Sequence, residues 1–150
     1  MKLHNQTAGH LNLRRHNEKQ IDYIFADYDQ FFEGLSYRHQ RELYLPDQEG
    51  TLKGHDILTL SEKSIAAVRF CLYDGFVAEV QSHKTVKLTL ELNAKKSKKS
   101  KPNEKVYILT AQGTDDILID LSPTGAPIIN MLMSMDANTP RTIRWAFQEK

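Results

Sequence analysis

The residues best suited to bind a charged partner form one lysine-rich segment. Five lysines fall within seven positions, at Lys95, Lys96, Lys98, Lys99 and Lys101. Ammonium groups at this density repel one another and solvate well, so residues 94–104 are predicted to form a mobile basic loop at the tip of a hairpin. An ammonium that contacts a phosphate displaces a counterion, and this gives salt-dependent affinity for nucleic acid without sequence preference.

Arginines elsewhere in the chain would widen this basic patch if the fold brings them near it. They are Arg14, Arg15, Arg38 and Arg41. Tyr or Phe side chains on the exposed face of a sheet would then stack against bases. The leading hypothesis is a non-enzymatic module that binds single-stranded or structured nucleic acid. The alternative is a protein-interaction or regulatory module, an accessory or inhibitor protein, in which the lysine loop only discourages edge-to-edge aggregation.

A weaker pattern suggests metal-dependent catalysis. Glu79 and Gln81 stand on one predicted strand as Glu-x-Gln, with Asp56 or Asp74 as an earlier carboxylate. Nucleases of the restriction-enzyme type use two carboxylates to hold Mg²⁺ and a third residue to orient the attacking water. Asp74 lies only five residues before Glu79, which is awkward for such a site, and Glu-x-Gln is common by chance. A nuclease-like enzyme is therefore the third hypothesis.

The sequence contains no other recognisable catalytic, metal-binding or cofactor-binding motif. The six histidines do not match the spacing of a helical zinc site, and a single cysteine excludes zinc ribbons. A nucleophile elbow, a phosphate-binding loop and a dinucleotide-binding glycine pattern are all absent. Cys71 is predicted to be a small buried hydrophobic residue of a strand. The sequence therefore predicts no catalytic residue, no metal and no cofactor.

Length and composition indicate one folded domain. The chain has 150 residues, of which 40% are hydrophobic and 26% charged, with a formal net charge of +1. This length is typical of a single domain with a sizeable core, and the small net charge gives no overall attraction to nucleic acid or to an anionic membrane. The lone cysteine and the lack of an apolar leader or bilayer-spanning run predict a cytoplasmic protein without a membrane partner.

The segment 17–35 carries the pattern of an amphipathic helix. Asn17 and Gln20 match a capping box, and apolar residues recur after them at helical spacing. Gly34 is suited to end this helix. The five aromatic residues of the segment are predicted to face the core, because an aromatic stripe is far more often core than binding surface. Residues 1–16 show no periodicity and are predicted to be a flexible arm.

Most of the remaining chain shows strand patterns. Alternating or β-branched runs predict strands at 56–60, 67–73, 76–81, 85–93, 105–111, 117–121 and 142–147. Asp74-Gly75 is suited to a two-residue hairpin turn, which would pair 67–73 with 76–81. Two of the resulting cross-strand pairs mix a charged residue with an apolar one. A helix over residues 61–73 that ends at Gly75 is therefore the alternative.

Two further segments complete the predicted fold. Residues 36–55 are expected to form a loop or short helix. Residues 127–135, apolar and rich in methionine, are expected to form a short buried helix with Pro127 in its first turn. The predicted class is α+β: an antiparallel β meander of about six strands, as a sheet or a partly open barrel, with an N-terminal amphipathic helix and a short C-terminal helix.

Overall fold

The protein is built from β-strands throughout the part that could be described. The computed structural model describes residues 10–18, 21–45, 50–92 and 103–150. These ranges contain eleven strands and no helix, so the α+β class is wrong. They also contain no helix that could cross a membrane. The strands are β1 (His10–Glu18), β2 (Ile21–Phe32), β3 (Leu35–Leu45), β4 (Thr51–Leu60), β5 (Ser64–Cys71), β6 (Phe76–Ser82), β7 (Thr85–Leu92), β8 (Asn103–Gln112), β9 (Asp116–Leu121), β10 (Pro127–Met135) and β11 (Arg141–Glu149).

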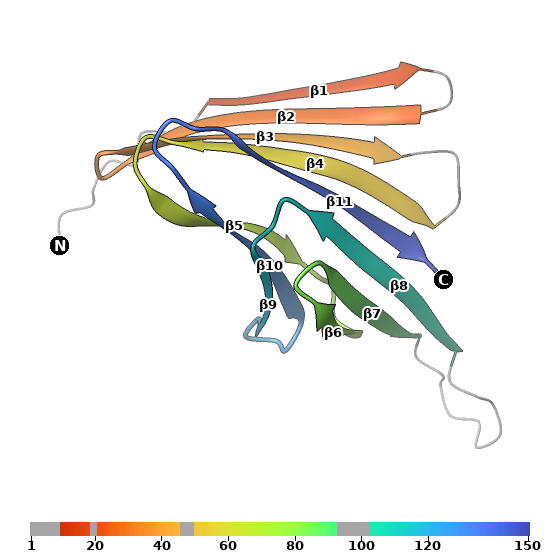
Figure 1. Cartoon of the computed structure of the whole chain (residues 1–150). Helices are drawn as coiled ribbons and strands as arrows, with labels where there is room; N and C mark the ends of the chain where they lie inside the picture. The colour runs from red at the N-terminus through yellow and green to blue at the C-terminus, as the bar shows by residue number, and fades with distance from the viewer. Residues whose placement is uncertain (1–9, 19–20, 46–49, 93–102) are drawn as a thin grey trace.

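The strands form two antiparallel sheets, a large sheet A and a small sheet B. Sheet A has the order β1-β2-β3-β4-β11-β8-β7-β6, and sheet B has the order β5-β10-β9. The chain leaves sheet A after β4 to form β5, returns for β6 to β8, and leaves again for β9 and β10 before β11 fills the centre of sheet A. Sheet B covers one part of sheet A, whereas β1 and β2 extend beyond it (Figure 1). One face of sheet A is therefore covered unevenly.

The predicted N-terminal helix is wrong, because its residues form strands. β2 pairs with β1 on one side and with β3 on the other, which satisfies its backbone groups without a helix. Tyr, Phe and Ile are strong strand formers, and they occur on both faces of β2. Residues 10–16 of the expected arm belong to β1, and residues 1–9 lie outside the described residues.

Gly34, expected to end a helix, forms a hairpin turn with Glu33. Their φ angles are 88° and 48°, so both central residues have the positive φ that a type I′ turn requires. Phe32 and Leu35 close the turn as a cross-strand pair. This turn sets the register of β2 against β3. The segment 36–55, expected to be a loop or short helix, contains most of β3 and the first half of β4.

The predicted C-terminal helix is also wrong. Its residues form β10, the central strand of sheet B, which pairs with β5 and β9. Pro127 is the first residue of this strand, a position where its missing N–H is tolerated. Ile129, Met131 and Met133 point inward and are fully buried, whereas the alternate side chains lie on the outer face. The apolar run is continuous because both faces of β10 are largely buried.

The strand prediction for 67–73 is confirmed, but its pairing is wrong. β5 pairs with β10 and β6 pairs with β7, so the two strands lie in different sheets. Asp74-Gly75 is a connection that carries the chain from sheet B to sheet A, with a positive φ only at Gly75. Cys71 is exposed on the outer side of sheet B, so the prediction that it is buried is also wrong.

The core lies between the two sheets. β4 shows the expected period of two, with Asp56, Leu58 and Leu60 buried and the intervening residues only half-buried. From the other central strands, Leu109 and Ile143 are fully buried and face sheet B. We call this inner side of sheet A its concave face and the opposite side its convex face. No residue of β2 or β3 whose side chain is described belongs to the fully buried core.

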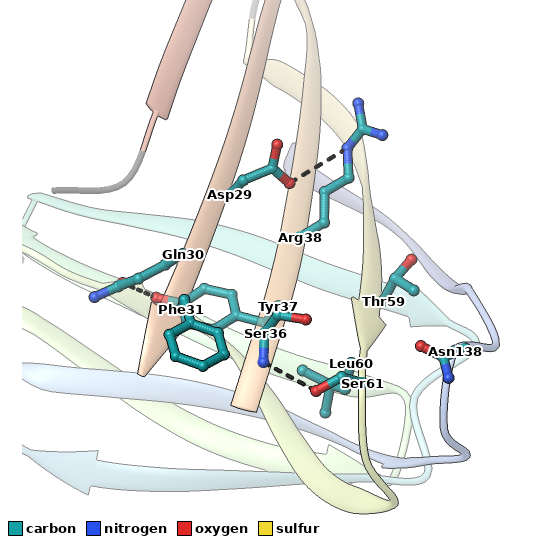
Figure 2. A pocket seen from close by; sticks show the side chains of 10 residues that line it. All are labelled: Asp29, Gln30, Phe31, Ser36, Tyr37, Arg38, Thr59, Leu60, Ser61 and Asn138. Carbon is teal, nitrogen blue, oxygen red and sulfur yellow. Dashed lines mark hydrogen bonds and ion pairs between the residues drawn. The ribbon is translucent and has the colours of Figure 1, made fainter. Parts of the chain in front are cut away.

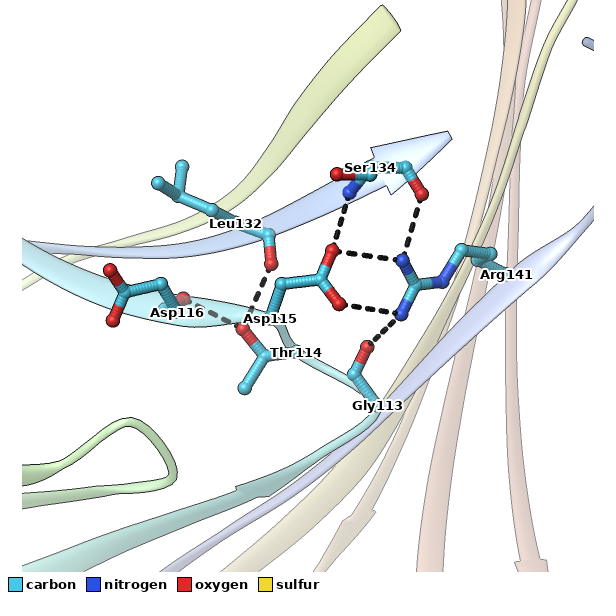
Figure 3. Close-up of polar contacts among 7 residues, drawn as sticks. All are labelled: Gly113, Thr114, Asp115, Asp116, Leu132, Ser134 and Arg141. Carbon is cyan, nitrogen blue, oxygen red and sulfur yellow. Dashed lines mark hydrogen bonds and ion pairs between the residues drawn. The ribbon is translucent and has the colours of Figure 1, made fainter. Parts of the chain in front are cut away.

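A polar network fixes the connection between the two sheets. Arg141, at the start of β11, donates to both carboxylate oxygens of Asp115 at 3.0 and 3.2 Å, and to the carbonyl oxygens of Ser134 and Gly113 (Figure 3). The Ser134 N–H donates to the same carboxylate at 2.6 Å. The hydrogen bonds from Arg141 and Ser134 lower the pKa of Asp115. This network is structural, because its donors and acceptors satisfy one another.

Candidate binding pocket

The largest hollow described in the protein lies at the end of the β2–β3 hairpin. It has a volume of about 540 Å³, within the range typical of small-molecule sites. The turns after β4 and β10 form its other side (Figure 2). Its lining combines two aromatic residues with short polar side chains and one ion pair: Asp29, Gln30, Phe31, Ser36, Tyr37, Arg38, Thr59, Leu60, Ser61 and Asn138.

Two aromatic rings give the pocket its apolar surface. Phe31 is 56% exposed and is one of nine large apolar side chains that are exposed among the described residues. Tyr37 lies on the next strand and is half-buried; Phe31 is in register with Ser36 and Tyr37 with Gln30, so the two rings project from opposite faces of the hairpin end. An exposed ring that lines a hollow is available for stacking against a ligand, whereas a core ring is not.

The polar groups around these rings are held in place. The Ser36 N–H donates to Ser61 Oγ at 2.9 Å, and the Ser61 N–H donates to the Ser36 carbonyl at 2.9 Å, so the hairpin is tied to the turn after β4. The Asn138 N–H donates to the Leu60 carbonyl at 2.6 Å, and its backbone has a positive φ of 55°. The side chains of Thr59 and Asn138 make no hydrogen bond within the described residues and are open to a ligand.

Gln30 is oriented by two tyrosine hydroxyls. Tyr28 donates to Gln30 Oε1 at 2.9 Å, and Tyr37 donates to the same oxygen. With its oxygen occupied, the amide presents its N–H groups as free donors among the described contacts. Burial, and secondly the nearby Tyr28, raise the pKa of Tyr37, so its hydroxyl keeps its proton at neutral pH. The Gln30 amide is therefore a fixed donor beside the Tyr37 ring on the concave face.

The charges of the pocket compensate one another. Arg38 donates to the two carboxylate oxygens of Asp27 at 3.0 and 2.7 Å, and its Nε lies 3.7 Å from Asp29 Oδ1. This bidentate bond, first, and the negative charge of Asp27 raise the pKa of Arg38. Because its guanidinium is already paired, Arg38 has little free charge to attract an anion. The arrangement suits an uncharged, hydrogen-bonding ligand.

A buried carboxylate, Asp56, lies on the concave face of β4. Asp56 is fully buried and accepts hydrogen bonds from Arg41 Nε at 2.7 Å and Trp145 Nε1 at 2.7 Å, and it contacts His39 Nε2. Burial raises its pKa, but the hydrogen bonds of His39, Arg41 and Trp145 outweigh this effect and lower it below its ordinary value. The cluster is therefore a charged structural anchor at the edge of the core.

Gly54 makes this anchor possible. It stands opposite Trp145 in the register of β4 and β11. A Cβ at this position would lie 2.5 Å from the indole ring and 2.5 Å from the Glu42 carbonyl oxygen. Only glycine lets the indole lie against the strand and reach Asp56.

Comparison with known proteins shows similarity of fold to solved structures. The chain matches no known family model, and no curated protein matches it in sequence. Two solved structures of one protein, heparinase III (the BT4657 gene product), one of them with methylated lysines, superpose on it with TM-scores of 0.66 and 0.65. The fold resembles part of heparinase III. Both matches cover 97% of this chain but only 22% of the heparinase III chain, at 11% sequence identity.

The arginines predicted to widen the basic patch lie on two strands, β1 and β3. Arg38 and Arg41 lie on opposite faces of β3, where Asp27 and Asp56 engage them. Arg14 and Arg15 are consecutive residues of β1, the edge strand, and pair with Phe25 and Ile24. The lysines from Lys95 to Lys101 lie outside the described residues.

The carboxylates of the nuclease hypothesis are also separated. Asp56 on β4 and Glu79 on β6 are divided by β11, β8 and β7, and they occupy opposite faces of sheet A. Asp74 lies in the connection before β6 and accepts a hydrogen bond from Thr124 at 3.1 Å. Among the described residues, no group of three His, Cys, Asp or Glu side chains could hold a metal ion.

Sequence reasoning missed the pocket because it depends on the β2–β3 hairpin. Glu33-Gly34 is not one of the dipeptides that signal a type I′ turn most strongly. The available signal was the high proportion of Tyr, Phe and Ile in 21–32, which favours a strand over a helix. Ser61 and Asn138 come from distant turns, and no local pattern indicates that they approach the hairpin.

Proposed function

We propose that this chain is a non-enzymatic β-sandwich module that binds carbohydrate in the pocket at the end of the β2–β3 hairpin. The observation that carries this proposal is the exposed Phe31 ring, which lines one hollow together with the free hydroxyl of Thr59 and the free amide of Asn138. A sugar ring has an apolar C–H face and a rim of hydroxyls. It therefore needs an aromatic surface and neutral hydrogen-bonding groups at the same place.

The electrostatics of the pocket favour an uncharged sugar. Arg38 is neutralised by Asp27 and lies close to Asp29. The free donors and acceptors, from Gln30, Thr59 and Asn138, are neutral and match hydroxyl groups. A nucleobase would also stack on Phe31, but its phosphates would meet two carboxylates in the immediate surroundings.

The fold supports the proposal only in general terms. Heparinase III is named for activity on a polysaccharide, and this chain corresponds to about a fifth of its length. At 11% identity this likeness concerns the fold, so the ligand is inferred from the pocket itself. A binding module attached to or acting with a carbohydrate-active protein is consistent with both observations.

The proposal is tested by comparing two aromatic variants. Phe31→Ala removes the pocket ring, whereas Tyr73→Ala removes a ring that is 79% exposed elsewhere. Binding of neutral oligosaccharides, measured by calorimetry against a panel of hexose and pentose polymers, should weaken at least about tenfold in Phe31→Ala. Tyr73→Ala should bind as the wild type does. Equal losses in both variants, or no binding by the wild type, would overturn the proposal.

Nucleic-acid binding through Lys95–Lys101 stays a prediction, since those lysines lie outside the described residues. Two of the arginines expected to help them, Arg38 and Arg41, are paired with carboxylates. A binding measurement with single- and double-stranded oligonucleotides at low salt separates this hypothesis from carbohydrate binding, because electrostatic attraction is strongest there.

A further inference from the structure

A second hollow lies at the centre of the convex face of sheet A, around Ala146. It has a volume of about 190 Å³ and is lined by Thr110, Gln112, Arg144, Trp145 and Ala146. Ala146 stands in register between Lys53 on β4 and Thr110 on β8, and Arg144 stands in register with Gln112. The small Ala146 side chain is the floor, because its longer neighbours rise around it. The Trp145 ring points to the other face, where it donates to Asp56.

The side chains around this floor are hydrogen-bond donors without partners. Arg144, Lys53, Thr110 and Gln112 are exposed, and none has a side-chain hydrogen bond or ion pair within the described residues. The arginines of the two networks described above differ in this respect, since Arg141 and Arg41 each bind a carboxylate. Two uncompensated cations beside a hydroxyl and an amide form an arrangement that suits an oxyanion.

The nearest acidic side chain in the same row of the sheet is engaged by a histidine. Glu42 Oε2 lies 3.3 Å from His55 Nε2, and His55 stands between Glu42 and Arg144 in the register of β3, β4 and β11. Glu42 is therefore directed toward His55 and lies two strands away from Arg144. The positive potential around Ala146 is not cancelled at this point.

We propose that the hollow around Ala146 binds a carboxylate or sulfate group of an acidic polysaccharide. Arg144 would hold the oxyanion by a forked pair of hydrogen bonds, Lys53 would add charge, and Thr110 and Gln112 would bond neighbouring hydroxyls. The aromatic residue in the lining, Trp145, is 3% exposed and turns its ring to the other face, so the lining offers no exposed ring of the kind that stacks the bases of single-stranded nucleic acids. The chemistry thus favours a sugar acid over a nucleotide.

The position of the hollow relative to the hairpin pocket supports a polymer as ligand. Thr59 of the pocket and His55 lie on the same face of β4, four residues apart, and His55 pairs with Arg144. At about 3.4 Å per residue the two places are separated by about 14 Å along the strand. One chain of linked sugar rings could occupy both. This polymer assignment rests on the proposed carbohydrate function, whereas oxyanion binding at Arg144 does not.

The test compares two tetrasaccharides of equal length, one of linked hexuronic acids and one of neutral hexoses. Arg144→Gln removes the charge and keeps a polar side chain. Arg69→Gln is the matched control, because Arg69 is an exposed arginine on the outer side of sheet B. In calorimetric titrations, Arg144→Gln should weaken binding of the acidic tetrasaccharide about tenfold or more. It should leave binding of the neutral one unchanged, and Arg69→Gln should change neither.

A titration with inorganic sulfate, followed by NMR of the arginine side chains, separates the two proposals. The Arg144 Nε–H resonance should shift and saturate, while that of Arg69 should not. If sulfate binds at Arg144 but neither tetrasaccharide binds, the carbohydrate function fails and the oxyanion site stands. The oxyanion site is overturned if Arg144 responds no more than Arg69. Tighter binding of an oligonucleotide than of the acidic tetrasaccharide, lost in Arg144→Gln, would replace the polysaccharide with nucleic acid.

Discussion

Sheet A has a covered part and an uncovered part, and the same alternation of side chains serves a different purpose in each. Where sheet B lies over it, the concave face carries Leu58, Leu109 and Ile143, all buried. At the end of the β2–β3 hairpin the same face carries Gln30 and Tyr37, which are only half-buried and linked by a hydrogen bond, with Tyr37 packed against the margin of the core. A strand therefore supplies core where a second layer covers it and a polar site where none does.

The boundary between the two parts is marked by Asp56. Its carboxylate is fully buried beside the apolar core, yet its partners Arg41 and His39 keep 26% and 30% of their side chains exposed. The Arg41 guanidinium lies 4.9 Å from the Phe70 ring of sheet B. The charge is thus buried where the core ends, and its partners on β3 are only partly covered.

The largest effect is expected in the covered part. Leu109→Ala removes a fully buried side chain between the two sheets and should lower the free energy of unfolding by about 2–5 kcal/mol. Thr110→Ala, one residue along on the exposed convex face, should change it by less than about 0.5 kcal/mol. Urea denaturation of both variants measures the difference. Similar losses would mean that sheet B does not cover β8 as described.

A smaller loss is expected at the boundary. Asp56→Asn keeps the shape of the side chain but removes the negative charge that Arg41 and Trp145 bind. Weakening hydrogen bonds to a buried charged group should cost about 1.5–3 kcal/mol. Chemical denaturation of both proteins at neutral pH measures this difference in the free energy of unfolding. A variant as stable as the wild type would contradict the role of Asp56 as an anchor.

The same carboxylate predicts how stability depends on pH. Its pKa in the folded state is below the ordinary value of 3.8, because the hydrogen bonds outweigh the effect of burial. The resulting stability is fully present above 3.8 and is lost as the pH falls through the lower, folded-state pKa. Denaturation measured over this acidic range should show a steeper loss for the wild type than for Asp56→Asn. Parallel curves for the two proteins would refute the assignment.

The smallest effect on stability is expected in the uncovered part. Phe31 is 56% exposed, so Phe31→Ala should change the free energy of unfolding by less than about 0.5 kcal/mol. Its effect should instead be on ligand binding. Thermal unfolding with and without a neutral oligosaccharide separates an effect on stability from an effect on binding, since only the wild type should be stabilised by the ligand. A large intrinsic destabilisation would show that the ring belongs to the core.

Local patterns in the sequence were sufficient to predict the strands that have one buried face. The segments 85–93, 105–111, 117–121 and 142–147 alternate clearly or carry β-branched residues, and each is a strand in the structure. The alternation follows from burial on one side, which is a property of each strand by itself. These strands are three of the eight strands of sheet A and one strand of sheet B.

The two segments predicted as helices show where local patterns are insufficient. The aromatic residues of β2 recur at helical spacing and fall on both faces of the strand, so only pairing with β1 and β3 selects the strand. β10 has no alternation to detect, because neighbours on both sides and the core bury most of its side chains. In both cases long-range pairing overrides the local signal.

The candidate pocket was not predictable from the sequence for the same reason. It joins the β2–β3 hairpin to turns that contain Ser61 and Asn138, which are brought there by the sheet order and not by any neighbouring residue. The lysine-rich segment could be predicted as a binding site because its lysines are neighbours in the sequence. A site built from residues of distant turns has no such local pattern in a single sequence.

The most direct measurement for the carbohydrate proposal is an NMR titration of the ¹⁵N-labelled protein with neutral oligosaccharides. Binding in the hairpin pocket predicts that the amide resonances of Gln30, Phe31, Tyr37 and Asn138 shift together and saturate, while those of sheet B do not move. It also predicts that the Phe31 ring protons show contacts with the C–H groups of the sugar. Shifts confined to other surfaces, or none at a large excess of ligand, would contradict the proposed function.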